Sequence, residues 1–483
     1  YMRPLLGDPD PAVRAHAAAT LLRRGVSEEA RERLADMASG EDTEARVHGL
    51  RALGDWGDAA AFELALVGLS DPDAAVRRAA AVALAHIDPS RAVAPLVRAL
   101  RDGDRLVREA VAGALGGIGA PALGPTLAAL ADPAAEEGTL TALERLPAAE
   151  AAPEIQRYAR DAASQALHYH ALWCGIAPSE GDACMRLVAD SLRESARRHA
   201  LHALRAVGLL GDHDAIAVAT DNLESRDARQ RANALETLEG LGDTEVVRPL
   251  LRLWERTDAA PIALEGTLRR LLEDTDGWLR ASAALAARES SDMHVRAALA
   301  RLAASDPDPL VREAVTGTPQ GASAMETLPT TLSTMQRILF LRRVPLFADL
   351  PPADLKHIAT IAVERLYPDG ATIVRQGDPG DDLYIIVSGA VRVLAATDTD
   401  PQSQVELARC QAGEYVGEMA IISQDPRMAS LVAAGNVRTL CIGQQPFEGI
   451  LRERPETSLA VMRVLCTRLR EMQDRLHAHT VTS

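Results

Sequence analysis

Residues 413–433, GEYVGEMAIISQDPRMASLVA, place one glutamate and one arginine nine positions apart between small and apolar residues. The planar fork of an arginine gives paired, charge-assisted hydrogen bonds to a phosphate, and a glutamate carboxylate is a strong acceptor for a hydroxyl group. Glu418 and Arg427 are therefore candidate ligands for a phosphate and a sugar hydroxyl. The alternative is that these two side chains only pair with each other in a charged loop.

Short β-strands are predicted on both sides of this stretch. Four segments are β-branched and bounded by Gly, Pro or Asp: ATIVRQG (371–377), LYIIVSGAVRVLAA (383–396), VELARC (405–410) and ASLVAAGNVRTLCIG (429–443). About eight short strands at this spacing predict a small β-barrel or jelly roll. A short helix is expected before the strands, within residues 335–362, and a long helix after them, from Pro455 to about His479.

A different pattern fills the first two thirds of the chain. Four stretches share the form D-x-D-x-x-V-R: DPDPAVR (8–14), DPDAAVR (71–77), DGDRLVR (102–108) and DPDPLVR (306–312). Each precedes an alanine-rich apolar segment with helical spacing, in which Asp and Pro suit the helix start. One helix pair cannot bury its own apolar face, so a period of this size predicts stacked helical units.

These units resemble HEAT repeats, in which the Asp and Arg of the pattern form a polar ladder between neighbours. The resemblance covers roughly residues 1–315 and is weak over 135–290. We therefore expect a multidomain, mainly α protein: an α-solenoid of HEAT-like repeats at 1–315, a linker at 316–333, and an α+β domain at 334–483. The linker is indicated by its Thr, Ser, Gly and Pro content.

Residues 334–483 resemble the cyclic nucleotide-binding domain. The resemblance lies in VPLFADLPPADL (344–355), in GDPGDDLYIIVSGAVRV (377–393) and in GEMAIISQDPRMAS (417–430), which matches the phosphate-binding cassette. It implies that Glu418 binds the ribose 2′-hydroxyl and that Arg427 binds the cyclic phosphate. Gly417, Met419, Ala420 and Ala429 would line the sugar-phosphate, mostly through their backbone.

The residues after the arginine bear on which nucleotide is bound. Met428 stands where a threonine often favours guanine nucleotides, so cAMP is favoured over cGMP, while Ser430 remains a candidate hydroxyl donor. Leu465 and Leu469 lie on an apolar stripe of the last helix. One of them could cap the base as a lid, although plain packing on the domain or on a dimer mate explains most of the stripe.

Composition and spacing argue against several other functions. The net charge of −16 argues against general nucleic-acid binding. The uncharged run at 110–131 has the length of a membrane span but contains five glycines and two prolines, which favour a buried helix–turn–helix. The pairs His168/His170 and His199/His202 are too loosely set to hold a metal without further ligands, so no metal and no catalytic site is expected.

We therefore expect a non-enzymatic, cytoplasmic regulatory sensor. The solenoid would relay nucleotide binding to a protein partner or to a membrane-embedded effector, and a homodimer through the C-terminal helix is a further expected partnership. Two alternatives stay open. The chain could be the cytosolic regulatory tail of a membrane carrier resembling nucleotide translocases, or a scaffold whose nucleotide domain binds no ligand.

Overall fold

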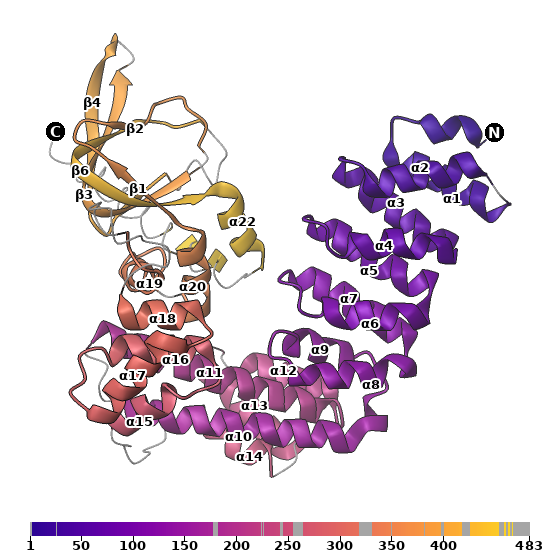
Figure 1. Ribbon diagram of the computed structural model, residues 1–483, viewed down its shortest axis with the longest axis horizontal. Coiled ribbons are helices and arrows are strands. Elements are labelled where there is room, and N and C mark those ends of the chain that lie inside the picture. Colours follow the sequence, from indigo (N-terminus) through magenta and orange to yellow (C-terminus); the bar gives the residue numbers. More distant parts are fainter. Residues whose placement is uncertain are drawn as a thin grey trace. The chain divides into compact units, whose positions relative to one another are not determined.

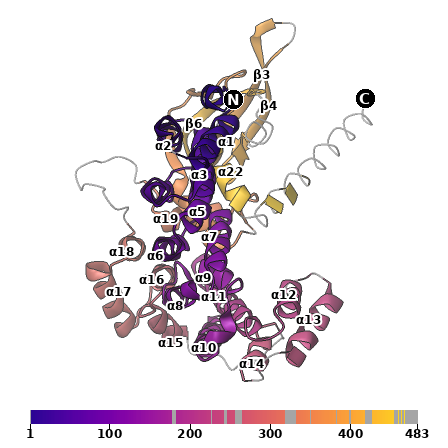
Figure 2. The ribbon, with the colours of Figure 1, turned by 90° about the vertical axis from the view of Figure 1, so that its right-hand side faces the viewer.

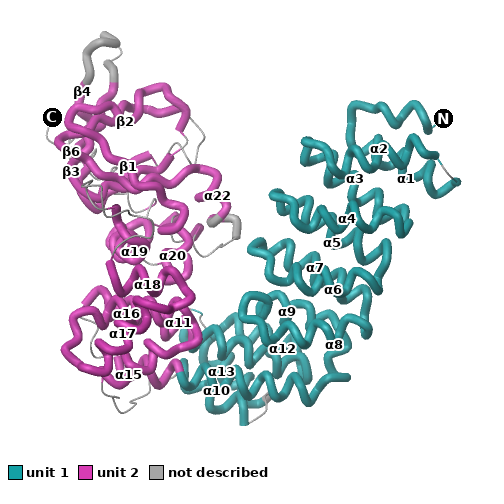
Figure 3. Tube along the Cα trace, in the orientation of Figure 1, with its two compact units in different colours: residues 1–168, 196–257 teal, residues 169–195, 258–483 magenta. Residues whose placement is uncertain are grey.

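The computed structural model forms two compact units, residues 1–168 with 196–257 and residues 169–195 with 258–483 (Figures 1 and 3). The boundary between the units falls within two long helices, α10 (Ala152–Ile176) and α11 (Ala183–Gly208). The structure describes residues 2–466 apart from 26, 177–181, 224, 226, 242–244, 255–263, 318–330, 349, 381, 398–399, 418–425, 454–457, 460–461 and 464–465.

Helices build the whole of the first unit. Short 3₁₀ turns at Arg3–Gly7, Ala59–Ala61, Ala129–Ala131 and Ala148–Ala151 join or extend them. Before α10 the helices are α1 (Pro11–Arg23), α2 (Glu28–Ser39), α3 (Thr43–Trp56), α4 (Phe62–Gly68), α5 (Ala74–Ile87), α6 (Pro89–Ala99), α7 (Arg105–Ile118), α8 (Ala120–Ala128) and α9 (Glu136–Leu143). After α11 they are α12 (His213–Asn222), α13 (Ala228–Leu241) and α14 (Val247–Leu251).

The second aspartate of each repeat motif starts a helix. Asp10, Asp73, Asp104 and Asp308 are the N-cap residues of α1, α5, α7 and α18 (Pro309–Thr316), and each side chain accepts a backbone N–H of the first turn. Such caps satisfy N–H groups that have no partner within the helix. The helix starts are therefore encoded locally, as the motif predicted.

The first aspartate and the arginine of the motif join neighbouring units. Arg77 donates from Nε and Nη2 to the two carboxylate oxygens of Asp102, at 2.7 and 2.9 Å, and from Nη1 to the carbonyls of Asp71 and Pro72 in its own turn. The hydrogen bond to Asp102 raises the pKa of Arg77 above its ordinary value. The same two-pronged contact joins Arg46 to Asp71 and Arg280 to Asp306.

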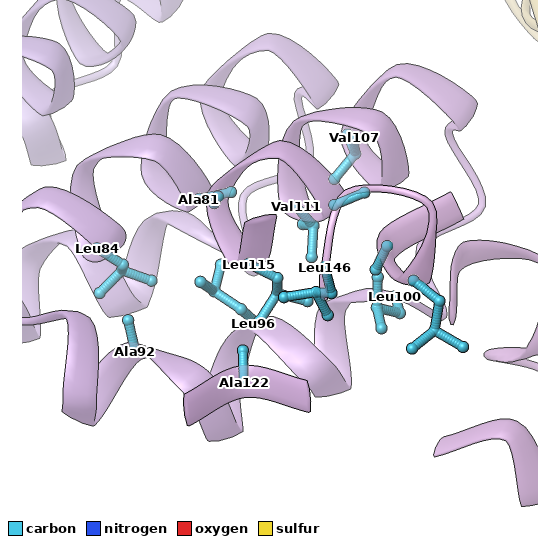
Figure 4. Close-up of a cluster of buried hydrophobic side chains, with 14 of the residues drawn as sticks. Ala81, Leu84, Ala92, Leu96, Leu100, Val107, Val111, Leu115, Ala122 and Leu146 are labelled. Atoms are coloured by element: carbon cyan, nitrogen blue, oxygen red, sulfur yellow. The ribbon is translucent and has the colours of Figure 1, made fainter. Parts of the chain in front are cut away.

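Alanine and leucine fill the space between the stacked helices. Figure 2 shows α1, α3, α5 and α7 following one another in a row, and each contacts the next. Figure 4 shows part of the core, where Leu84, Leu96 and Leu115 point between helices α5 to α8 and are fully buried. Small alanines such as Ala81 and Ala122 let the helix backbones approach closely.

The uncharged run at 110–131 lies in this core as a helix–turn–helix, as predicted. Helix α7 ends at Ile118, Gly119 has a positive φ of 78°, and α8 begins at Ala120. A residue without a Cβ adopts this φ at little cost. Among the described residues, no helix is long and apolar enough to cross a membrane.

The second unit combines the last repeats with the α+β region. Its helices beyond the shared α10 and α11 are α15 (Leu264–Leu271), α16 (Gly277–Ala286), α17 (Met293–Ser305), α18, α19 (Thr334–Leu341), α20 (Pro352–Ile361) and α22 (Gln444–Glu453). Ser333 and Gln336 form a capping box at the start of α19. Most of the expected linker, residues 318–330, lies outside the described residues, and the expected boundaries at 315 and 334 stay predictions.

An antiparallel sheet follows α20, in agreement with the expected β-rich domain. Its strands are β1 (Val363–Tyr367), β2 (Thr372–Val374), β3 (Asp382–Thr397), β4 (Asp400–Gln411), β5 (Tyr415–Val416) and β6 (Ser430–Gly443). The order is β1-β6-β3-β4, with β2 on β6 and β5 on β3. The long strands β3 and β6 pair from Asp382 opposite Gly443 to Leu394 opposite Ser430. This pairing places the end of β6 beside the start of β3, and the start of β6 beside Leu394.

We expect Arg77→Ala to loosen the contact between two repeats, because the largely buried Asp102 carboxylate loses both of its side-chain donors. The free energy of local opening in α5 and α7 should fall by about 1–3 kcal/mol, measured by native-state hydrogen exchange of the full chain. Arg105→Ala, which removes an exposed pair with Glu109, is the matched control and should change it by less than about 0.5 kcal/mol. Equal effects of the two substitutions would contradict the ladder's role.

Candidate ligand-binding site

The predicted ligand residues lie at the junction of β5, β3 and β6. Gly417 directly follows β5, Arg427 to Ala429 directly precede β6, and Ser430 is the first residue of β6. Glu418, Met419 and Ala420 lie outside the described residues, as do Leu465 and Leu469 of the expected lid. The roles expected for these five residues therefore stay predictions.

Arg427 is held from two sides by backbone carbonyls. It is 5 % exposed, and its Nη2 donates to the carbonyl of Asp382 at 2.6 Å while Nη1 donates to the carbonyl of Gly417 at 3.3 Å. The ring of Tyr384 lies 5.6 Å from the guanidinium carbon, within the range of a cation–π contact. These contacts fix the direction of the guanidinium without neutralising it.

The charge of this arginine has no carboxylate partner in the described part of the chain. Among the described residues no aspartate or glutamate lies in an ion pair with Arg427, and its buried Nε makes no hydrogen bond. A buried cation is costly unless an anion or several hydrogen bonds compensate it. An arginine has five N–H donors, of which the described contacts use two. The remaining donors and the positive charge suit an anionic oxygen cluster such as a phosphate.

Two features require a glycine at position 417: its positive φ in the turn and the close contact of its backbone with Arg427. Its φ is +98°, which favours glycine. A Cβ on this residue would lie 2.5 Å from Nη1 of Arg427 and 2.8 Å from the carbonyl oxygen of Asp382. The glycine therefore lets the end of β5, the start of β3 and the guanidinium lie close together. From the sequence we expected only that the backbone of Gly417 would line the sugar-phosphate.

Backbone hydrogen bonds hold the arginine segment against the turn before β3. The N–H of Arg427 donates to the carbonyl of Asp378 and the N–H of Gly377 donates to the carbonyl of Arg427, each at 2.8 Å. The hydroxyl of Ser430 accepts the N–H of Gln376 at 2.9 Å. Ser430 is buried, so its hydroxyl first serves this turn. A hydroxyl that accepts one hydrogen bond still carries a proton to donate, and the expected role of Ser430 as a donor to a ligand stays a prediction.

The two residues after Arg427 differ in exposure. Met428 is 75 % exposed, and Ala429 is half-buried. The methionine side chain therefore carries no packing role within the described residues, and it offers a ligand no hydroxyl donor.

Tyr384 and Asp382 are functional candidates that sequence reasoning missed. Burial, and next the carboxylate of Asp382, raise the pKa of Tyr384 to about 12, so its hydroxyl stays protonated at neutral pH. Asp382 contributes through its backbone carbonyl, which no residue-type pattern reveals. Tyr384 lies in the predicted strand segment 383–396 and Asp382 directly precedes it, but the segment gave no sign of their role. The orientation of β3 toward Arg427 depends on the pairing of β3 with β5 and β6.

We expect Gly417→Ala to displace the Arg427 guanidinium, because the added methyl group would overlap Nη1. The N–H groups of Gly377 and Arg427, which bond across this junction, should exchange faster in the ligand-free full chain, by about 1–3 kcal/mol in opening free energy. Gly413→Ala is the matched control, because Gly413 has a similar φ of +89° but no atom within 4 Å of its Cβ position. Equal changes would mean that backbone strain alone, and not the contact with Arg427, explains Gly417.

Comparison with known proteins gives relatives that match about a quarter of this chain. The chain is 34% identical over 112 residues to a cAMP-dependent protein kinase regulatory subunit of Colletotrichum orbiculare, covering 23% of this chain and 27% of that protein. It is 38% identical over 125 residues to a cyclic nucleotide-gated potassium channel of Rhizobium etli, covering 26% and 33%. It is 35% identical over 127 residues to the cyclic AMP receptor protein of Thermus thermophilus, covering 26% and 58%. Each match spans less than two thirds of the relative.

Two family models match separate parts of the chain. The model for HEAT repeats matches residues 32–116 and 62–146, which include helices α3 to α9. The model for the cyclic nucleotide-binding domain matches residues 364–454, which include the sheet, Arg427 and α22. Both matches agree with the order that the sequence predicted. The chain therefore carries HEAT repeats in its N-terminal part, followed by a cyclic nucleotide-binding domain.

Proposed function

We propose that this chain is a regulatory sensor that binds a cyclic nucleotide, preferentially cAMP, and relays binding through its HEAT-like solenoid to an effector. The observation that carries the proposal is the buried guanidinium of Arg427, which is aimed by two carbonyls and has no carboxylate partner among the described residues. A cyclic phosphate would supply the missing negative charge. The role requires no catalytic step in this chain.

Each ligand group would have a partner of matching chemistry. Arg427 would bind the phosphate through its remaining donors, and Glu418 would accept the ribose 2′-hydroxyl. The backbone of Gly417, Met419, Ala420 and Ala429 would line the sugar-phosphate, with Ser430 as an added hydroxyl donor. Leu465 or Leu469 would cap the base.

The preference for cAMP has two supports. Two of the matched relatives, the kinase regulatory subunit and the receptor protein, carry cAMP in their names. Met428 cannot supply the hydroxyl that a guanine edge would use. cGMP would therefore bind less tightly, because a polar group that is desolvated without a partner costs affinity.

Side-chain contacts connect the nucleotide domain with the last repeats of the same compact unit. The carboxylate of Glu313 in α18 accepts the backbone N–H and the hydroxyl of Thr334 at the start of α19; the hydroxyl contact is 3.2 Å. Asp190 of α11 pairs with Arg342, just after α19. The ammonium of Lys356 in α20 lies 5.5 Å from the ring centroid of Trp278 in α16. A shift of α19 or α20 would therefore move groups of the solenoid.

Helix α22, which directly follows β6, also contacts the region of α19 and α20. Phe447 of α22 packs edge-on against the fully buried Phe347, which lies between α19 and α20, with ring centroids 6.5 Å apart. A nucleotide that prefers one position of α22 and the lid would shift the population of the helical positions behind it. The free energy available for the relay is limited to the nucleotide's difference in affinity for the two positions.

The effector could be a protein on the solenoid or a membrane-embedded protein. The match to a gated potassium channel is the specific observation that favours the second candidate, in which the chain acts as the regulatory part of a membrane carrier or channel. A homodimer through the C-terminal helix fits either effector. In both cases the protein would act at the cytosolic side, where cyclic nucleotides are made.

We expect cAMP to stabilise the full chain and Arg427→Ala to abolish the effect. A ligand bound only by the folded state adds about 2.7 kcal/mol to the unfolding free energy at 100 times its Kd. Thermal unfolding and titration calorimetry with cAMP, cGMP and 5′-AMP measure this. Arg427→Lys keeps the charge but removes the fork, so it should lose most of the affinity.

The matched control is Arg375→Ala, which removes an exposed arginine three residues from Asp378 on the neighbouring turn. It should retain the full response to cAMP. If no nucleotide shifts the unfolding of the unmodified chain, the domain is an empty scaffold and the sensor proposal is wrong.

For the relay, we expect cAMP to change the hydrogen exchange of α18 as well as of α19, because Glu313 bonds across their junction. Arg342→Ala removes the pair with Asp190 and should reduce the response around residues 183–195 while cAMP still binds. Arg343→Ala, an exposed neighbour, is the control and should leave the response unchanged. A cAMP response that stops at residue 334 in the unmodified chain would rule out a relay through these contacts.

A further inference from the structure

A cluster of two histidines and one glutamate lies in the first compact unit. His199 and His202 come from one face of α11, and Glu136 is the first residue of α9. One ligand atom from each residue lies within 4.8 Å of the others. The sequence alone showed two histidines without the further ligands that a metal site needs. The fold adds a third candidate ligand, the carboxylate of Glu136.

One nitrogen of His202 faces the carboxylate of Glu136 in this cluster. His202 is 5 % exposed, and its buried Nδ1 makes no hydrogen bond to any described residue. Nδ1 lies 3.3 Å from Oε2 of Glu136. Ligand atoms around a tetrahedral ion with bonds of about 2.0–2.2 Å are roughly 3.3 Å apart. The separation of these two atoms therefore already suits a shared metal ion.

The opposite atoms of both ligands are held by second partners. Nε2 of His202 lies 3.1 Å from Oε2 of Glu137, and the hydroxyl of Tyr158 donates to Oε1 of Glu136 at 2.5 Å. Arg205 in turn donates to Oε1 of Glu137 at 2.8 Å. Metal-ligating histidines usually donate their other N–H to a carboxylate, which fixes the tautomer and the ring orientation. Here this arrangement leaves Nδ1 of His202 and Oε2 of Glu136 directed at each other.

A groove gives the cluster access to solvent. It has a volume of about 890 Å³, and Glu136, Tyr158 and His199 line it together with residues of α8 and α10. A small ion can therefore enter, and a water molecule has room to fill a fourth position. Two imidazoles, one carboxylate and water form a ligand set that suits zinc and neighbouring divalent transition ions better than Mg²⁺ or Ca²⁺.

We propose that Glu136, His199 and His202 bind a divalent transition-metal ion of the zinc class, with Glu137 and Tyr158 as positioning residues. The ion joins α9 to α11, because His199 and His202 lie 63 and 66 positions after Glu136 in the sequence. It thereby fastens the repeat array where the regular short helices give way to the long α10 and α11.

The test uses the full chain after removal of metals with a chelator. We expect one equivalent of added Co²⁺ to give the visible absorption of a low-symmetry nitrogen–oxygen site without the near-ultraviolet band of thiolate ligation, and Zn²⁺ to displace it. Zn²⁺ alone should also raise the unfolding temperature. His199→Ala, a half-buried position, should weaken Zn²⁺ binding by at least tenfold, because even second partners of metal ligands contribute roughly 10–100-fold.

Glu136→Gln provides the second variant, since it keeps the shape and the acceptor for Tyr158 but loses the charge, and it should also weaken binding. His86→Ala, an exposed histidine at the end of α5, is the matched control and should bind as the unmodified chain does. Circular dichroism confirms that each variant is folded. No Zn²⁺ binding by the unmodified chain, or equal binding by His199→Ala, would overturn the proposal and leave His202 as a bridge between two glutamates.

Discussion

The contact between a repeat arginine and the first aspartate of the next repeat is the interaction on which the solenoid depends. Arg77 satisfies its own turn through two carbonyls and the next turn through the carboxylate of Asp102. Apolar burial drives the stacking but is not directional. The paired hydrogen bonds add direction, because a planar fork fits a carboxylate in one geometry. The alanine-rich core therefore supplies close packing between units, and the arginine–aspartate contacts determine which units lie next to each other.

The nucleotide domain uses an arginine in the opposite way. Arg427 is also held by carbonyls, but no carboxylate of the described residues completes its charge. In the ladder the fork is satisfied within the protein and contributes to stability. In the site the fork is oriented by carbonyls, and in the proposed function its donors without a partner among the described residues would bind the ligand. The difference is not in residue type but in what the fold places opposite the guanidinium.

The proposed coupling between nucleotide binding and a response in the repeats would depend on continuous packing between them. Helices α19 and α20 lie in one compact unit with the last repeats and with the sheet, and Glu313, Asp190 and Trp278 connect them to the solenoid. Packed interfaces of this kind move between discrete arrangements and do not deform continuously. The proposed metal site would stiffen the array within the first unit, where it joins α9 to α11.

The sequence by itself determined the repeat units and the β-rich domain, because caps, turns and helical or strand periodicity are local. It pointed to Gly417, Arg427 and Ser430 through the resemblance of residues 417–430 to a phosphate-binding cassette, and their roles toward a ligand stay predictions. It could not identify Tyr384 and Asp382, nor join Glu136 to His199 and His202. Those contacts depend on strand register and on helices that meet from distant positions in the chain. Local propensities fix where an element begins and ends, but the chemistry of a pocket depends on distances of a few ångströms between elements. Only tertiary packing decides these distances, so the tertiary structure alone revealed the histidine–glutamate cluster and the arginine that has no carboxylate partner among the described residues.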